Sequence, residues 1–318
     1  MKILALLGTA SLGAATSLGA LRAPQAPCST DLASTSSGGE LSNGYSDGPS
    51  LSWRGRYLAY ASVASNLTPE LDDNEENDVF VLDRLSGQVQ LVSQNALGEV
   101  GSGSSSNPSI SADGRYLVFE STATNLVPGG TDGTALVFLR DLQDGSTRVV
   151  SRGLGGNEPS DDCYSPVISA DGNRVAYLSF AGDIVPGDAN GQADVFVWTR
   201  ATQATVRASV SSLGAEANDE SMGPSLSADG SLVAFSSLAS NLAPGDANGN
   251  FDVFVHALAT GSTSRVSLGV QPSGPVGASV FPAIAPRAHT IAFHGSTDDV
   301  VPGDDNGVPD IFVASCRN

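Results

Sequence analysis

The residues best suited to chemistry are aspartates and asparagines in a short loop motif, D-x-N-G-x-x-D. Oxygen side chains that alternate along a tight loop can wrap a calcium ion, with backbone carbonyls completing the shell. The motif or a close variant supplies four candidate metal sets: Asp72, Asn74 and Asp78; Asp188, Asn190 and Asp194; Asp246, Asn248 and Asp252; and Asp304, Asn306 and Asp310. A fifth place, with Gly130, Asp132 and Leu136, has lost the pattern.

The same loops have a second interpretation that needs no metal. Asp and Asn side chains also hydrogen-bond to nearby backbone amides, which holds a turn together without a ligand. The EF-hand pattern is not met, because the loop is short and has no terminal glutamate. Calcium and a self-satisfied turn therefore both remain open.

The elements that must position these loops follow from an internal repeat of about 58 residues. The repeat is marked by prolines at Pro49, Pro108, Pro166, Pro224 and Pro282. Each unit contains four short runs rich in β-branched and aromatic residues, separated by Gly- and Asp-containing turns, and no run has a helical period. Four strands in a fixed period predict an all-β, five-bladed β-propeller with four-stranded antiparallel blades. A solenoid of stacked β-coils is the alternative.

The beginning of each unit resembles a known family. The segments PSISADG from Pro108, PVISADG from Pro166 and PSLSADG from Pro224 are similar to the WD40-like repeat of the TolB type, also called PD40. The first and fifth units, PSLSWRG and PAIAPRA, lack the Asp-Gly turn. The resemblance covers the chain from about residue 28 to its end, implies a propeller fold and leaves the function open.

The two ends of the chain are expected to complete one blade together. The last unit stops after its third strand, at residues 310–315, and residues 31–50 align without a gap with residues 206–225. Residues 31–37 should therefore pair with residues 310–315, so that residues 28–318 form one closed domain. In the other blades the positions of Cys28 and Cys316 are the outer positions of a tight turn, which predicts a disulfide between them. Cys163 is left over and is expected to be a partly buried, unreactive thiol.

A ligand site is expected on the face that carries the inter-blade crossovers, because those segments differ most from blade to blade. The crossovers are predicted at residues 43–47, 104–107, 161–164, 219–222 and 279–281. The candidate ligand-binding residues in or beside them are Tyr45, Asp47, Asn107, Tyr164, Met222 and Phe281. Ordinary packing between blades is the alternative for each of them.

Catalysis is not expected. A glycoside hydrolase needs two carboxylates about 5–9.5 Å apart that face one cavity. The predicted innermost strands, residues 49–52, 108–111, 166–169, 224–227 and 282–285, contain no acid. The sequence also lacks the G-x-S-x-G, H-E-x-x-H and P-loop motifs.

Composition and charge restrict the partners. A net charge of −19 excludes a protein that seeks nucleic acid or anionic lipid. Lys2 followed by an apolar run to Ala20 predicts a signal peptide over residues 1–23, hence a secreted or periplasmic protein without a membrane span in its mature form. The sequence therefore favours a monomeric, non-catalytic binding or scaffolding protein with a protein or glycan partner outside the cytoplasm. A calcium-dependent lectin and a glycoside hydrolase are the alternatives.

Overall fold

The computed structural model describes residues 29–69, 72, 74–270, 274–286 and 290–315. The chain divides into two units, residues 1–33 and residues 34–318. In the first unit, described residues 29–33 contain no regular secondary structure. In the second, the described residues form five antiparallel sheets, four of four strands and one of three. This confirms the all-β class and the five repeated sheets.

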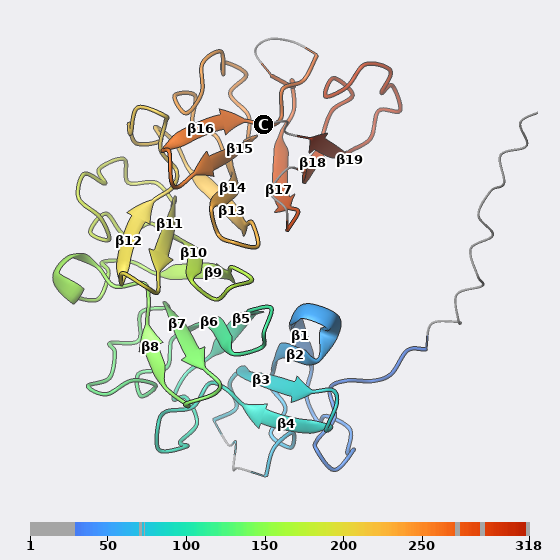
Figure 1. Ribbon diagram of the computed structural model, residues 1–318, viewed down its shortest axis with the longest axis vertical. Helices are drawn as coiled ribbons and strands as arrows, with labels where there is room; N and C mark the ends of the chain where they lie inside the picture. The colour runs from blue at the N-terminus through green and yellow to red at the C-terminus, as the bar shows by residue number, and fades with distance from the viewer. Residues whose placement is uncertain (1–28, 70–71, 73, 271–273, 287–289, 316–318) are drawn as a thin grey trace, which may run out of the picture. The chain divides into compact units, whose positions relative to one another are not determined.

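Each sheet is built from strands that are consecutive in the chain (Figure 1). The first sheet comprises β1 (Ser46–Leu51), β2 (Tyr57–Ser62), β3 (Asp78–Asp83) and β4 (Gln88–Leu91). The second comprises β5 (Ser105–Ile110), β6 (Tyr116–Ser121), β7 (Leu136–Asp141) and β8 (Thr147–Val149). The third comprises β9 (Cys163–Ile168), β10 (Arg174–Ser179), β11 (Asp194–Thr199) and β12 (Ala204–Arg207). The fourth comprises β13 (Ser221–Leu226), β14 (Leu232–Ser237), β15 (Asp252–Ala257) and β16 (Ser262–Arg265), and the fifth β17 (Ser279–Ile284), β18 (Thr290–Gly295) and β19 (Asp310–Ser315). We call them blades one to five.

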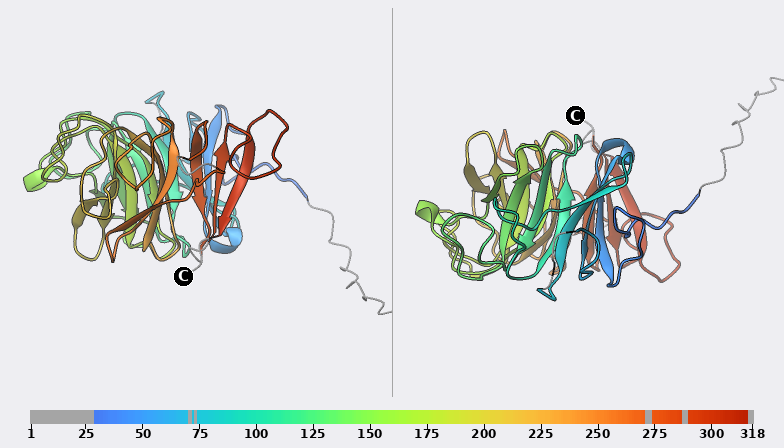
Figure 2. Two further views of the ribbon diagram at one scale, coloured as in Figure 1. Left: turned by 90° about the horizontal axis from the view of Figure 1, so that it is seen from above. Right: turned by 90° about the horizontal axis from the view of Figure 1, so that it is seen from below.

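The first strands of consecutive blades pack against one another, from β1 and β5 through β9 and β13 to β17. Figure 1 shows these strands innermost and the later strands of each blade further out. Because neighbouring strands run antiparallel, the turns after the first and third strands lie on one face, which we call the hairpin face. The loops after the second strand and the crossovers between blades lie on the other, the crossover face. Figure 2 shows the strands running between these two faces.

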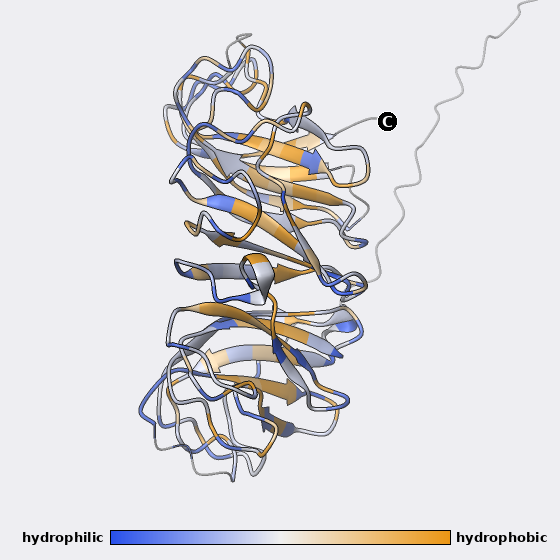
Figure 3. Cartoon of the chain, turned by 90° about the vertical axis from the view of Figure 1, so that its left-hand side faces the viewer, coloured by the Kyte–Doolittle hydropathy of each residue, from blue (hydrophilic) through white to orange (hydrophobic). Residues whose placement is uncertain are grey.

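Aromatic pairs at one repeated position stabilise each sheet. A ring on the second strand stands beside a phenylalanine on the third, as in Phe119–Phe138, with centroids 5.7 Å apart, and Phe235–Phe254, with centroids 5.9 Å apart. Such cross-strand aromatic pairs add to the stabilisation from apolar burial. The third strands of blades two and three bury nearly continuous apolar runs because another sheet packs on each side, and apolar colour follows the strands in Figure 3.

The innermost strands begin earlier than the sequence predicts. Each contains a β-bulge at the residue before the repeated proline, where the backbone φ is positive in all five blades. The bulge residues are Gly48, Asn107, Ser165, Gly223 and Phe281. The strand continues across this irregularity, so residues 46–47, 105–107, 163–164, 221–222 and 279–281 belong to strands and not to crossovers, which corrects that part of the prediction.

The predicted closure of blade five is not observed in the described residues. There β19 pairs with β18 on one side, and no other described strand pairs with its other edge. Thr35 forms a bridge with Leu41, and the Ser37 hydroxyl accepts a 2.8 Å hydrogen bond from the Val89 amide in β4. Cys28 and Cys316 lie outside the described residues, so the predicted disulfide stays a prediction.

Candidate functional site

The D-x-N-G-x-x-D loops precede the third strand of their blades, and the asparagine organises each of them. In blade three the Asn190 side-chain amide donates to Asp194 at 3.1 Å and to the Ala217 carbonyl at 2.9 Å. Its side-chain oxygen accepts from the Gln192 amide at 2.7 Å. The same Asn-to-Asp bond recurs in the other three loops, at 2.8 Å from Asn74 to Asp78, 2.9 Å from Asn248 to Asp252 and 2.7 Å from Asn306 to Asp310. The asparagines therefore hold these turns through hydrogen bonds within the chain, as the second interpretation proposed.

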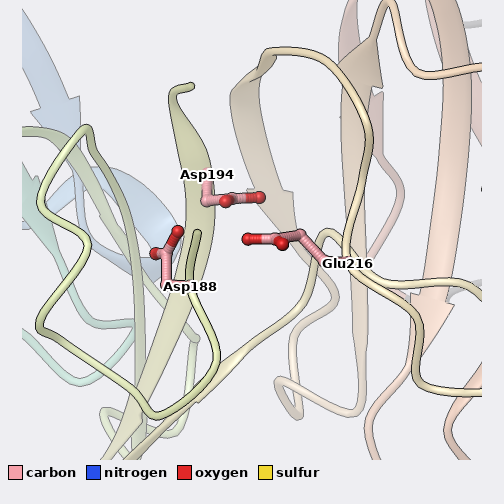
Figure 4. Close-up of side chains that lie close together, drawn as sticks. All are labelled: Asp188, Asp194 and Glu216. Carbon is pink, nitrogen blue, oxygen red and sulfur yellow. The ribbon is translucent and has the colours of Figure 1, made fainter. Parts of the chain in front are cut away.

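Blade three also contains an acidic group that could hold a metal ion. One carboxylate oxygen from each of Asp188, Asp194 and Glu216 lies within 4.8 Å of the other two. Figure 4 shows the three side chains pointing toward one another, the two aspartates from the loop and β11, and the glutamate from the crossover to blade four. The sequence prediction included Asp188 and Asp194 but missed Glu216.

An arginine already supplies positive charge to this group. Nη1 of Arg207, from β12, lies 3.2 Å from Asp188, 3.3 Å from Asp194 and 2.5 Å from Glu216. The arginine side chain is 7% exposed and that of Asp194 is fully buried. A buried carboxylate needs a positive partner, and a guanidinium with several donors can serve three acceptors.

The pKa values of the group record two opposing effects. Burial raises the pKa of Asp188 to about 6, and the neighbouring Asp194 adds to the increase while Arg207 opposes it. Burial also raises the pKa of Asp194, against hydrogen bonds from Ser209 and the charge of Arg207. For Glu216, burial is outweighed by hydrogen bonds from the Ala189 amide and from Arg207, so its pKa is lowered.

The other blades contain parts of this arrangement. In blade four, Arg265 Nη1 lies 3.3 Å from Asp246 and 3.4 Å from Asp252. In blade one, Leu91 stands at the place of the arginine, and burial raises the pKa of Asp78 to about 7. In blade three, and separately in blade four, the structure brings the predicted pair of aspartates together around an arginine of the same blade.

The predicted ligand-binding residues separate into two groups. Tyr45 and Phe281 are 62% and 71% exposed. Tyr164 and Met222 are partly buried and pack against the core between blades three and four. For these two residues the packing interpretation describes what the structure shows.

A cavity of about 350 Å³ lies toward the crossover side of the innermost strands. Residues from four blades line it, including the bulge residues Gly48, Asn107, Ser165 and Gly223. Asn107 is thus a predicted residue that the structure places at a cavity, and exposed Asp47 directly precedes its bulge residue Gly48.

Glu120 on β6 is a residue of this region that the sequence interpretation missed. Its carboxylate accepts hydrogen bonds from the Asn107 side chain at 2.8 Å, the Ser106 hydroxyl at 3.0 Å and the Ser165 amide of the next blade at 2.8 Å. It therefore connects the bulges of blades two and three. An acid at this position is unusual among the repeats, where Ala61, Leu178, Ser236 and His294 correspond to it, and that was a usable signal.

Two further features bear on function. Cys163 is fully buried, and burial raises the pKa of its thiol to about 11, which makes thiolate chemistry unfavourable. Within the described part of the chain, no helix has the length and apolar character needed to cross a membrane.

Comparisons with known proteins identify the fold. No family model matches the sequence, and no curated protein matches it. TolB from Acinetobacter baumannii is 14% identical, with a TM-score of 0.47, over 81% of this chain and 53% of that chain, so this chain spans about half of its length. A candidate TolB from Agrobacterium tumefaciens is 16% identical with a TM-score of 0.51, over 86% of this chain and 77% of that one. The β-propeller domain of the Trilobed protease from Pyrococcus furiosus, whose topology is described as open velcro, is 10% identical with a TM-score of 0.51, over 87% and 70%. The chain is thus similar in structure to TolB and to other β-propeller domains.

Proposed function

We propose that this chain is an exported, non-catalytic binding or scaffolding propeller that holds a protein partner on its crossover face. The supporting observation is the ring of bulges there, where Asn107, Ser165 and Phe281 adopt φ values of 50–55° that favour glycine. Such strained residues cluster at sites of function. Phe281 and Tyr45 add exposed aromatic side chains of the kind that anchors protein interfaces.

The absence of catalysis is part of the proposal. The innermost strands as observed contain one carboxylate, Asp47, among their described residues, where glycoside hydrolysis requires two. The nearby acid Glu120 is engaged by three hydrogen-bond donors. A hydrolase would instead show turnover that falls when Asp47 or Asp162 is replaced.

A closed ring is also proposed. Ile311 and Val313 of β19 are 70% and 63% exposed, whereas Val195 and Val197, at the same places in blade three, are fully buried. The Val89 amide donates a hydrogen bond to the Ser37 hydroxyl, and the Thr263 amide donates an equivalent 2.9 Å bond to the Ser212 hydroxyl. Ser37 and Ser212 are equivalent when residues 31–50 are aligned with residues 206–225, so the two bonds agree with that alignment.

On this alignment residues 29–32 correspond to β12 and would add the fourth strand beside β19, which shortens and shifts the expected segment of residues 31–37. Mass spectrometry of the exported chain should find Cys28 joined to Cys316. Free thiols at both positions would count against this closure.

The binding role is tested by exchanging the exposed aromatics. A partner captured from the medium of the native cells should bind the Tyr45→Ser/Phe281→Asn double variant at least about tenfold more weakly, because exposed aromatics carry much of the energy of an interface. Asparagine tolerates the left-handed backbone at residue 281. Leu85→Ser, at an 80% exposed position on the hairpin face, is the matched control and should leave binding unchanged. Equal binding by all three proteins would contradict the proposed face.

A calcium-dependent glycan-binding protein is the second candidate. The acidic group of Asp188, Asp194 and Glu216 favours it, because three convergent carboxylates suit a hard cation. Arg207 competes with it, since its guanidinium lies among the same oxygens. Calcium binding would require the arginine to move away or the ion to bind beside it.

A further inference from the structure

A cavity of about 450 Å³ lies where blade one meets blade two on the hairpin face. Its walls include Tyr57, Gln88, Gln90, Asp113 and Leu142. No described residue hydrogen-bonds to the side-chain amides of the two glutamines, which are exposed. The cavity therefore combines an aromatic ring with polar groups that are available to a ligand.

The next junction has the same construction, but an arginine fills it. Between blades two and three, the guanidinium carbon of Arg200 lies 4.2 Å from the ring centroid of Tyr116. Its Nε donates a 2.9 Å hydrogen bond to the carbonyl of Gly172. The ring face and the carbonyl together hold the planar cation, through a cation–π contact and a hydrogen bond.

The two junctions correspond residue by residue. The Leu142 amide donates to the Arg115 carbonyl at 2.8 Å, and the Arg200 amide donates to the Asn173 carbonyl at 2.8 Å, so the backbones coincide. In both, the tyrosine ring lies against a turn glycine, Gly114 beneath Tyr57 and Gly172 beneath Tyr116, so closely that a Cβ would be 2.1 and 2.4 Å from a ring carbon. Leucine replaces the arginine at the first junction.

The remaining turn glycines also have an arginine beside them. Arg84 donates from Nη1 to the Gly55 carbonyl at 2.8 Å, and Arg174 packs on Gly230, where a Cβ would lie 2.8 Å from its Cγ. At Gly114 the tyrosine is in place, and no described side chain donates to the glycine carbonyl. Among the described turn glycines, this one has the aromatic ring but no arginine side chain on the glycine itself.

Two arginines already lie at the cavity, Arg115 in its wall and Arg56 over the Tyr57 ring, but both are paired with aspartates. Arg56 lies 4.7 Å from the Tyr57 ring centroid, as Arg115 does from Tyr116 at 4.9 Å, and each is paired with an aspartate at 2.8 Å. Tyr116 nevertheless accepts Arg200 as a second arginine. Asp113 contributes an exposed carboxylate, and the net charge of −19 attracts a basic partner.

We propose that the Tyr57 cavity binds an arginine side chain presented by a basic protein or peptide partner, which takes the place that Arg200 fills at the next junction. The guanidinium stacks on Tyr57 and donates to the Gly114 carbonyl. This inference rests on the proposed binding role, but it concerns the hairpin face and can fail independently of the crossover face.

The test uses the whole exported chain, with the capped peptide Gly-Gly-Arg-Gly-Gly as the probe. An NMR titration measures the binding of the peptide. Lysine and citrulline versions of the peptide separate guanidinium recognition from charge and from shape. The arginine peptide should bind more tightly than the lysine peptide, and the citrulline peptide should bind at least about tenfold more weakly, because it lacks the cation.

The decisive variant is Leu142→Arg, which places an arginine where Arg200 stands at the next junction. It should weaken binding of the arginine peptide by about tenfold while leaving the melting temperature close to that of the parent. Leu258→Arg makes the same change at the corresponding position of blade four, where Arg174 already lies on Gly230, and should leave binding unchanged. The Tyr45→Ser/Phe281→Asn variant should also bind normally, which separates this test from that of the crossover face.

Three results would overturn the proposal. The first is unchanged binding by Leu142→Arg, which would place the peptide elsewhere. The second is an equal loss in Leu142→Arg and Leu258→Arg, and the third is equal binding of the arginine and lysine peptides. Either of the last two would indicate only general attraction to an acidic protein.

Discussion

Blades one and three share an acidic loop but differ in how its charge is balanced. Both have the asparagine-to-aspartate bond, 2.8 Å in blade one and 3.1 Å in blade three. Blade three adds Arg207 and Glu216, whereas blade one has Leu91 and Val100 at those places. The conformation of the turn therefore comes from the asparagine and aspartate themselves. The arginine has a separate effect, because it offsets the free-energy cost of burying the carboxylates.

The test with the largest expected effect gives blade three the residue that blade one has at one position, leucine in place of Arg207. Arg207→Leu should lower the free energy of unfolding by about 3–5 kcal/mol, because it leaves buried carboxylates without their cation. Chemical denaturation measures the change. Arg148→Leu, at an exposed position of β8, is the control and should change stability by less than about 0.5 kcal/mol. A loss below about 1 kcal/mol in Arg207→Leu would show that the carboxylates are protonated or solvated instead.

The second test uses pH on blade one. The folded pKa of Asp78 is raised to about 7 by burial, with Asp72 and Glu76 adding to the effect, whereas an unfolded aspartate has a pKa of about 3.9. The folded state binds this proton more tightly, so its stabilising effect is complete below about pH 4 and is lost as the pH rises to about 7.

Relative to Asp78→Asn, the parent chain should therefore lose about 2–4 kcal/mol of stability between pH 4 and pH 8. The Asn variant is the matched control, because the other carboxylates titrate alike in both proteins. Parallel stability curves for the two proteins would mean that Asp78 is ionised when folded.

The sequence predicted the repeats well because they are local. A proline, a Ser-x-Asp-Gly turn and a β-branched strand recur at fixed spacing, and the turn closes through short-range bonds, such as Asp113 accepting the Arg115 amide at 2.9 Å. The site was harder to predict, since Glu216 reaches Asp188 from the crossover to the next blade. The arginines at 207 and 265, one repeat apart, were a visible sign of the ion pairs. The bulges escaped because Asn107, Ser165 and Phe281 do not mark a positive φ as Gly48 and Gly223 do.

The smallest expected effect is that of calcium on the melting temperature. The test compares the parent chain with Arg207→Leu, in which blade three has the leucine of blade one. Because the Arg207 guanidinium already lies among the three carboxylates, millimolar calcium should leave the melting temperature of the parent chain unchanged within about 1 °C. A ligand that bound at 100 times its Kd would instead add about 2.7 kcal/mol of stability. In Arg207→Leu the three carboxylates lose their competitor, so calcium should raise the melting temperature and a chelator should reverse the change. Arg148→Leu should respond as the parent does. A calcium-dependent rise in the parent would favour the second candidate function, and no rise in Arg207→Leu would show that the carboxylate geometry suits a guanidinium and not an ion.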